Sequence, residues 1–295
     1  MSVHANGEQR PRQAVLVTGA SSGIGEAIAL DLVKRGYQVF AGVRSKSAAS
    51  ELLSKACPDE HGHGIIEPMQ LDVTEDEQVA AVATAVAEAA GVNLLGIVNN
   101  AGIAVAGPLE FMPIEVLRRQ FEVNVLGHVN VTQAFLPQLR RSGGRIVFIG
   151  SISGHVSSRL LGAYASSKFA LEAIADAFRR ELATWNLKVS VIEPGRVPTP
   201  IWSTSIARAK DLIAGLPPEA TEYYQDLIET VLDGAKDATE SGAAPEEVAK
   251  AVHRALTDRR PRTRYYVGGD AHIMNVLRRV LSDPMLDRLI RINNR

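Results

Sequence analysis

The sequence predicts an α/β fold in which helices cover both faces of a doubly wound parallel sheet of about seven strands. Two observations lead to this fold class. Short runs rich in β-branched residues recur between longer stretches with a helical period, which is the pattern of parallel strands joined by crossover helices. A glycine-rich turn also lies directly after the first of these runs and opens the first helical stretch.

The expected elements alternate along most of the chain. The expected strands are residues 14–18, 37–43, 65–71, 94–99, 145–150, 188–193 and 264–267. The expected helices are residues 24–35, 75–90, 113–141 and 163–184. Because no linker rich in Pro, Gly or Ser divides this alternation, we expect a disordered tail over residues 1–12 and a single domain over 13–295. Residues 200–244 carry no strand signal and read as an insertion, either a lid over a substrate or a solvated connection.

Composition excludes several classes of protein. The chain has 295 residues, of which 46% are hydrophobic, so it can bury a large core and is not disordered. Its formal net charge of -1 argues against nucleic acid as its main partner. The single cysteine, Cys57, permits no intramolecular disulfide, which suits a reducing compartment such as the cytoplasm. No apolar run approaches the roughly 18 residues of a membrane span.

The glycine-rich turn has the chemistry of a phosphate-binding loop. Glycine permits a positive φ and a close approach of backbone to ligand, and the free N–H groups at the start of a helix attract a pyrophosphate. Glycines in a tight turn can also be purely structural, and the spacing differs from the common G-x-G-x-x-G pattern. The turn reads Thr18, Gly19, Ala20, Ser21, Ser22, Gly23, Ile24, Gly25.

With this turn, the sequence resembles the short-chain dehydrogenase/reductase family in its single-domain branch, whose glycine motif is T-G-x-x-x-G-I-G. Further family motifs follow in order: residues 99–102 (Asn-Asn-Ala-Gly), Asn124, Ser151, Tyr164 with Lys168, and Pro194 with Gly195. The resemblance implies a Rossmann-type fold and an oxidoreductase that uses NAD(P) and acts on CH–OH groups.

Tyr164 and Lys168 lie four residues apart on an expected helix, which places them on one face as a pair. A free phenol has a pKa of about 10, so its use as a base at neutral pH requires roughly 4 kcal/mol. A lysine ammonium at about 4 Å supplies a similar amount at an effective dielectric constant of about 20, but burial of the phenolate opposes it. A second cation is therefore needed, and the oxidised nicotinamide ring carries one.

Ser151 follows an expected strand, where its hydroxyl can hydrogen-bond the substrate oxygen, with Ser153 as the local rival. The family pattern favours Ser151 and implies that Asn124 holds a water of a proton relay. Taken singly, each of these residues also fits an ordinary structural role, such as a cap or a core edge. The resemblance therefore implies the catalytic residues Asn124, Ser151, Tyr164 and Lys168.

The end of the second expected strand, where an NAD site usually has an acidic residue, falls on Val43, and Arg44 follows it. Because a guanidinium can bind a 2′-phosphate, we expect NADP(H) to be preferred, with NAD(H) possible. Asp72 matches the family position near adenine, or it caps the helix that opens near Thr74. The resemblance implies that the cofactor contacts Gly19, Ser21, Ser22, Gly23, Ile24, Gly25, Arg44, Asp72, Val73, Asn100, Ala101, Gly102, Tyr164, Lys168, Pro194, Gly195, Val197 and Thr199.

We expect substrate contacts from residues 105–109, from Ser153, from residues 156–161 with Val156 and Leu161, and from Ile201, Trp202 and Ile206. Their mostly apolar character favours a lipophilic alcohol or ketone. His61 and His63 are too few to predict a metal site. An apolar helical stripe from Ile273 to Ile290 suggests core or dimer packing, and the arginines beside it leave peripheral membrane association as the alternative.

The expected function is hydride exchange between NADP(H) and a lipophilic secondary alcohol or its carbonyl counterpart. The alternative is a catalytically silent sensor or scaffold that binds nicotinamide. The resemblance also implies that the helices 113–141 and 163–184 pair across a two-fold axis in a homodimer or homotetramer.

Overall fold

All strands of the described chain join one parallel sheet with the order β3-β2-β1-β4-β5-β6-β7. The computed structural model describes residues 11–56, 64–240 and 242–293. The strands are β1 (Arg12–Val17), β2 (Gln38–Val43), β3 (Ile65–Gln70), β4 (Val92–Asn99), β5 (Arg145–Ile149), β6 (Lys188–Pro194) and β7 (Arg264–Val267). These bounds agree with the expected strands to within two residues, and the predicted fold class is confirmed.

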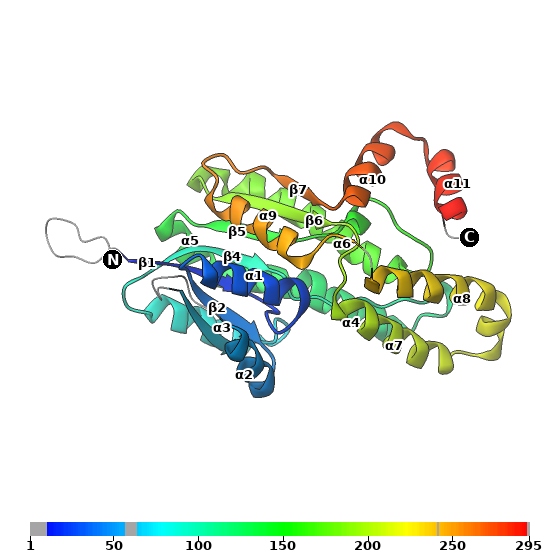
Figure 1. Cartoon of the computed structure of the whole chain (residues 1–295), viewed down its shortest axis with the longest axis horizontal. Coiled ribbons are helices and arrows are strands. Elements are labelled where there is room, and N and C mark those ends of the chain that lie inside the picture. Colours follow the sequence, from blue (N-terminus) through cyan, green and yellow to red (C-terminus); the bar gives the residue numbers. More distant parts are fainter. Residues whose placement is uncertain (1–10, 57–63, 241, 294–295) are drawn as a thin grey trace, which may run out of the picture.

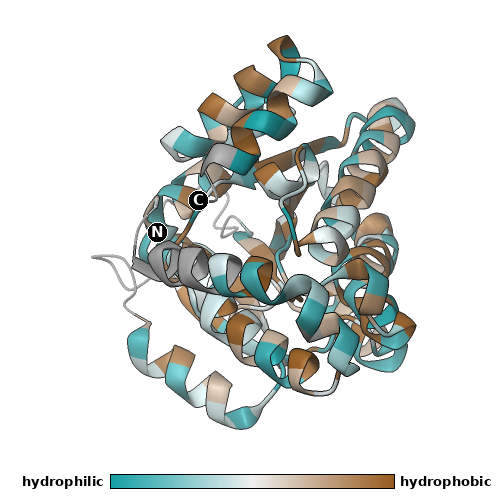
Figure 2. Ribbon diagram, turned by 90° about the vertical axis from the view of Figure 1, so that its right-hand side faces the viewer, coloured by the Kyte–Doolittle hydropathy of each residue, from teal (hydrophilic) through white to brown (hydrophobic). Residues whose placement is uncertain are grey.

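Helices cover both faces of this sheet (Figure 1). The helices of the described chain are α1 (Gly23–Lys34), α2 (Lys46–Lys55), α3 (Asp76–Glu88), α4 (Ile114–Phe121), α5 (Gly127–Ser142), α6 (Gly162–Glu181), α7 (Pro200–Ala214), α8 (Pro218–Glu240), α9 (Pro245–Thr257), α10 (Gly269–Val280) and α11 (Asp283–Asn293). Most of these helices carry both hydrophilic and hydrophobic residues along their length (Figure 2), as expected of helices that cover a sheet.

Two hydrophobic cores lie on opposite faces of the sheet because side chains alternate along each strand. On β1, Val15 and Val17 point into the core formed with α1 and α9. Ala14 and Leu16 point into the other core, formed with α3, α5 and α6. Strand order reverses between β1 and β4, and ligands of such sheets bind in the crevice at the carboxyl ends of the strands there.

The expected helix over residues 113–141 is interrupted. A π-helical segment, η2 (Glu122–Leu126), separates α4 from α5. Segments of this kind occur mostly as single turns and often at functional sites. Here the segment carries Asn124, whose side chain is fully buried.

Residues 200–244 hold two helices, α7 and α8, which pack against each other. The insertion expected there had no assigned helix, and α2 and α9 were not predicted either. The helices α10 and α11 fall on the predicted helical stripe from Ile273 to Ile290. The predicted tail also needs one correction. Residues 1–10 lie outside the described residues, but Arg12 belongs to β1, where it pairs with Val92.

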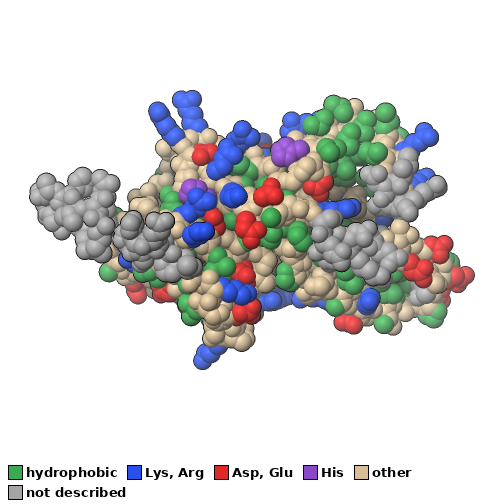
Figure 3. Space-filling model, viewed as in Figure 1, with side chains coloured by type: hydrophobic (Ala, Val, Ile, Leu, Met, Phe, Trp, Pro, Cys, Tyr) green, Lys and Arg blue, Asp and Glu red, His purple; other side chains and the backbone are tan. Residues whose placement is uncertain are grey.

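The apolar stripe of α10 and α11 is partly buried and partly exposed. Leu286 is buried, whereas Ile273, Val280 and Met285 of the stripe and the neighbouring Val276 are each more than half exposed. Hydrophobic side chains gather over this end of the molecule in Figure 3. None of the described helices has the length and apolar character required to cross a bilayer. Cys57, His61 and His63 lie outside the described residues.

Candidate active site

A cavity of about 620 Å³ opens at the carboxyl ends of the strands. It brings together every predicted catalytic and cofactor-binding residue. Its lining includes Gly19, Ser21, Ser22, Gly23, Ile24, Gly25, Arg44, Asp72, Val73, Asn100, Ala101, Gly102, Asn124, Ser151, Tyr164, Lys168, Pro194, Gly195, Val197, Thr199 and Trp202.

The glycine turn leaves an open cradle at the start of α1. Gly19 and Gly23 have φ values of +64° and +57°, which favour glycine. A Cβ on Gly19 would lie 2.8 Å from the Cα of Ala101, and one on Gly25 would lie 2.2 Å from the carbonyl oxygen of Gly19. Ser22 precedes α1 without a side-chain cap, so the first amide groups of the helix keep their hydrogen-bonding capacity. These donors suit an anionic group such as a pyrophosphate.

Polar side chains fix the floor of this cradle. The Asn100 Nδ2 donates to the carbonyl oxygens of Thr18 and Gly19 at 2.9 and 3.1 Å. The Thr18 hydroxyl accepts from the amides of Asn100 and Ala101 at 2.9 and 3.0 Å. His128, which the sequence analysis missed, lies 2.7 Å from the Ala101 carbonyl through Nε2, and burial lowers its pKa to about 3. The neutral ring therefore donates to that carbonyl and holds the loop without adding charge.

Two charged residues lie at the ends of β2 and β3. Arg44 is exposed at the cavity, immediately after β2. The Asp72 carboxylate accepts from the amide and the hydroxyl of Thr74 at 3.0 and 2.8 Å, so it caps the turn before α3 and not the helix itself, which begins at Asp76. Burial alone would raise the pKa of Asp72, but the Thr74 hydrogen bonds and the charges of Arg119 and Arg44 lower it. Asp72 thus caps a turn while remaining part of the cavity wall.

Ser151, Tyr164 and Lys168 meet at the bottom of the cavity. Ser151 caps a 3₁₀ turn, η3 (Ile152–Gly154), just after β5, and the other two lie one turn apart on α6. Their exposed fractions are 8%, 8% and 5%. The Lys168 Nζ lies 5.7 Å from the centre of the Tyr164 ring and donates to the Ile149 carbonyl at 2.8 Å. A phenol, a hydroxyl and an ammonium group therefore share one largely buried site.

Ser153 supports Ser151. Its backbone amide donates to the Ser151 Oγ at 3.1 Å, and its side chain is not part of the cavity lining. This bond occupies an acceptor position of Ser151 and leaves the hydroxyl proton available. Ser151 also hydrogen-bonds Tyr164.

Burial is the main influence on the charge states of Tyr164 and Lys168. Burial raises the pKa of Tyr164, against the smaller effect of the Ser151 hydrogen bond. Burial also lowers the pKa of Lys168 to about 8, while the Glu172 carboxylate opposes that change. At neutral pH the phenol keeps its proton and most Lys168 side chains remain charged.

The Asn124 side chain is engaged with protein groups. Its Oδ1 accepts from the Ile103 amide at 2.9 Å, and its Nδ2 donates to the Ile103 carbonyl and the Ser167 hydroxyl at 3.0 and 3.2 Å. Both amide protons are therefore used. Only the remaining lone pair of Oδ1 is left on this side chain for a relay water.

The expected substrate residues separate into two groups. Trp202 lines the cavity, and its indole Nε1 donates to the Val197 carbonyl at 3.0 Å. Ser153, Val156 and Leu161 are not part of the lining. Val105 and Ile201, which were also expected as substrate contacts, line the cavity. The remaining lining residues were not predicted as site residues. These are Ile103, Ala104, Glu115, Val116, Arg119, Val123, Ile149, Gly150, Leu71, Val43, Pro200, Thr204 and Arg208.

Comparisons with known proteins agree with this geometry. The family model described as "short chain dehydrogenase" matches residues 13–210. Retinol dehydrogenase 5 of Mus musculus is 36% identical over 267 residues, which cover 88% of this chain and 82% of that protein. An NADPH-dependent 3-dehydrocapnine reductase of Ornithobacterium rhinotracheale is 36% identical over 281 residues, covering 93% and 94%. A crystal structure of a short-chain dehydrogenase from Burkholderia cenocepacia in complex with NADP has a TM-score of 0.70 and 26% identity, covering 96% of this chain and 99% of that one.

Proposed function

The chain belongs to the short-chain dehydrogenase/reductase family of oxidoreductases, and on that premise we propose that it interconverts a lipophilic secondary alcohol and its ketone with NADP(H). The main support for this proposal is that Ser151, Tyr164 and Lys168 line the same cavity as the glycine cradle. A cofactor bound along the cradle would supply or accept the hydride. The residues of the chain handle the substrate oxygen and its proton.

In the direction of reduction, Ser151 donates a hydrogen bond to the carbonyl oxygen as negative charge develops there. Tyr164 then gives its phenolic proton to that oxygen, so hydride and proton together convert ketone to alcohol. Lys168 stabilises the resulting phenolate by its charge. The protonated state of the buried phenol favours this direction at neutral pH. The remaining lone pair of Asn124 Oδ1 would hold the relay water.

NADP(H) is the proposed cofactor because of Arg44. Three features of the cavity fit NADP(H): the open glycine cradle, the uncapped start of α1 and the Arg44 guanidinium just after β2. Glu26 in the first turn of α1 would repel a phosphate, but its carboxylate pairs with Lys55 at 3.0 Å. The reductase from Ornithobacterium rhinotracheale is described as NADPH-dependent.

Replacing Arg44 by Asp should weaken NADPH binding by roughly 100-fold, because a charge-assisted contact worth about 1.5–3 kcal/mol is replaced by repulsion. NADH binding should change by less than about 3-fold. Fluorescence titration of both nucleotides measures the ratio, with Arg141→Asp, an exposed arginine at the end of α5, as the control. An equal loss for both nucleotides would remove the assigned role of Arg44.

The substrate is proposed to be lipophilic because apolar side chains form much of the cavity wall beyond Tyr164 and Lys168. Among these side chains are Val105, Val116, Ile201 and Trp202. Matching proteins include retinol dehydrogenases and estradiol 17-beta-dehydrogenase 2. We propose α7 and α8 as the lid of this cavity, since α7 contributes Trp202, Thr204 and Arg208 to its lining. The lid and the sheet would form one domain.

NADPH oxidation across a panel of ketones and aldehydes tests the function. We expect turnover to be fastest with bulky apolar ketones. Tight cofactor binding with no turnover on any carbonyl would favour the alternative, a silent nicotinamide-binding sensor. The single cysteine suits a reducing compartment, and we place the protein in the cytoplasm.

A homodimer or homotetramer is proposed through η2, α5 and α6. Leu126 and Phe169 are 52% and 41% exposed, and α6 packs against η2. Pairing across a two-fold axis would bury both side chains. Light scattering should give twice or four times the monomer mass, and Phe169→Glu should lower it. A monomeric wild-type protein at micromolar concentration would contradict this assembly.

A further inference from the structure

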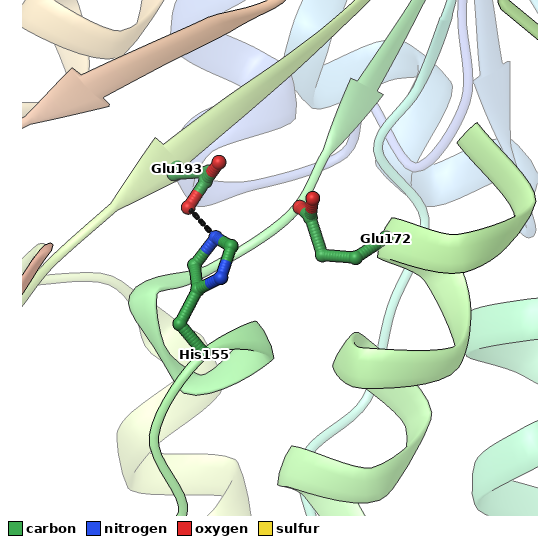
Figure 4. A group of neighbouring side chains, drawn as sticks. All are labelled: His155, Glu172 and Glu193. Atoms are coloured by element: carbon green, nitrogen blue, oxygen red, sulfur yellow. Dashed lines mark ion pairs between the residues drawn. The ribbon is translucent and has the colours of Figure 1, made fainter. Parts of the chain in front are cut away.

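Behind the catalytic pair lies a second cluster of charged side chains, formed by His155, Glu172, Glu193 and Arg264. Figure 4 shows the first three converging from different segments. The His155 Nε2 lies 2.5 Å from the Glu193 Oε2. The Arg264 Nη2 lies 2.7 Å from the Glu172 Oε2, and its Nε lies 3.5 Å from the Glu193 Oε1. Glu193 is fully buried, and its described polar contacts are these two ion pairs.

His155, Glu172 and Glu193 are each joined closely along the chain to a residue of the candidate active site, and Arg264 reaches them from β7. His155 follows the 3₁₀ turn that Ser151 begins. Glu172 lies one helical turn after Lys168 on α6. Glu193 immediately precedes Pro194 and Gly195 of the cavity wall. The cluster therefore ties together the three segments that carry the hydroxyl donor, the ammonium and the end of β6.

The spacing between these segments is tight. A Cβ on Gly154 would lie 3.1 Å from the Glu172 Cγ, and one on Gly150 would lie 3.2 Å from the Glu172 Oε1. The turn that begins at Ser151 is thus packed directly on the cluster. Loss of an ion pair inside the cluster would allow this turn to shift relative to α6.

A proton on His155 supplies the counter-charge closest to Glu193. Two cations act on Glu172, the Arg264 guanidinium and the Lys168 ammonium, and burial together with Glu193 raises the pKa of Glu172. Glu193 is fully buried, and the Arg264 Nε lies 3.5 Å from it while Arg264 is also shared with Glu172 and Asp176. With a neutral imidazole that shared guanidinium would be the nearest cation to Glu193, and burial of a poorly paired carboxylate is costly. A protonated imidazole pairs with Glu193 directly.

The surroundings of His155 agree with this assignment. Tyr266 of β7 lies against its ring, with His272 of α10 beyond, and Arg279 acts on Tyr266 through its charge. The pairing with Glu193 raises the pKa of His155, against opposing effects of burial and Arg264. His155 is 28% exposed in its side chain, so solvent can exchange its proton.

The same three ligand-type residues also suit a divalent cation by residue type. Arg264 argues against that occupant, because its guanidinium already contacts both carboxylates. A metal would also require a deprotonated imidazole beside that guanidinium. The proton is therefore the better counter-charge for Glu193.

We propose that His155 is a positioning residue which, in its protonated form and paired with Glu193, holds the turn of Ser151 in place against Lys168. This proposal rests on the proposed function for its kinetic consequence but not for its structural one. His155 acts through Ser151 and does not touch the substrate. Deprotonation of His155 would release the turn and lower the rate of the hydride step.

Titration of the histidine C–H signals by NMR tests the structural part in the active-site-intact protein. Loss of one signal in His155→Gln assigns it. We expect the pKa of His155 to lie above the usual value of about 6.5, and to fall to that value or below in Glu193→Gln. Glu181→Gln, an exposed glutamate on α6, is the matched control and should leave it unchanged.

A double-mutant cycle with Ser151→Ala tests the positioning role. His155→Gln should lower kcat by about 10- to 100-fold with little change in NADPH affinity, the loss expected when a reacting group moves by about 1 Å. In the Ser151→Ala background the same change should cost less than about 2-fold, because the group it positions is gone. A purely structural role would give the same loss in both backgrounds.

Three results would overturn the proposal: a pKa of His155 at or below about 6.5 in the wild-type protein, additive losses in the cycle, or one equivalent of tightly bound divalent metal with His155 no longer titrating. If His155 titrates as expected in a wild-type protein that reduces no carbonyl, the proposed function fails and the assigned charge state of the cluster stands.

Discussion

Tyr164→Phe is expected to lower kcat for carbonyl reduction by about 10³-fold or more, since general acid catalysis typically contributes 10²–10⁴-fold and no other phenol lines the cavity in the described residues. The Tyr164 ring is buried, and phenylalanine keeps that ring and removes only the hydroxyl. The fold and the NADPH affinity should therefore change little. Steady-state rates at saturating NADPH, together with a fluorescence titration of NADPH, measure both effects.

Tyr37→Phe is the matched control for this variant. Tyr37 is a partly buried tyrosine whose hydroxyl lies 3.4 Å from the His253 ring, away from the cavity. Its variant should keep wild-type turnover. If Tyr164→Phe also kept full turnover, the proton would have to come from another group, and the assigned role of Tyr164 would be wrong.

Lys168→Met is expected to lower kcat by about 10²-fold or more, because the phenolate formed after proton transfer would lose its nearby cation in a site of low dielectric constant. The dependence of the rate on pH should show the same contribution of Lys168. Since burial lowers the pKa of Lys168 to about 8, the ammonium is present below that pH and is lost above it. Wild-type reduction should therefore fall as pH rises through about 8, and the variant should keep only the fall that accompanies deprotonation of His155.

Lys188→Met provides a control of the same chemistry at the surface. Lys188 begins β6 and its Nζ donates to the Asn186 Oδ1 at 2.7 Å, outside the cavity. Its variant should show the wild-type profile. A wild-type profile in Lys168→Met would mean that another group, such as His155, controls the descending limb at high pH.

Much of the fold was predictable because the buried strands carry a local signal. Runs such as 14–18 and 264–267 are rich in β-branched or aromatic residues and are bounded by charged or turn residues. The helices that escaped prediction lack such signals. A proline begins each of α7 and α8, and charged residues interrupt the apolar pattern within them. The two helices pack against each other, and the local sequence does not indicate this contact.

The candidate site was predictable where its residues form short-range motifs. Tyr164 and Lys168 share a helix face and the glycine turn is contiguous, and the order of these motifs along the chain resembles the family, which indicated that they act together. The cluster around Glu193 had no such signal. Its members lie on α6, β6, β7 and the turn after β5, and only the strand order of the sheet brings Glu193 and Arg264 together.

The expected substrate contacts at Val156 and Leu161 could not be placed correctly from the sequence for a similar reason. Val156 and Leu161 lie in a loop whose path depends on Leu160, which has a φ of +59° and accepts a hydrogen bond from the Gly107 amide at 2.8 Å. A left-handed conformation at leucine is unusual, and nothing in the local sequence predicts it. The loop therefore lies differently from the expectation drawn from residue order alone.

The most direct test of the account follows a deuterium atom. Wild-type protein is incubated with a bulky apolar ketone and NADPH that carries deuterium at the reactive face of the dihydronicotinamide carbon, and the alcohol is analysed by mass spectrometry. We expect one deuterium on the carbinol carbon of a single enantiomer, and almost none with Tyr164→Phe. Bound NADPH that never passes its label to any carbonyl in the panel would contradict the assignment of this site as a hydride-transfer centre.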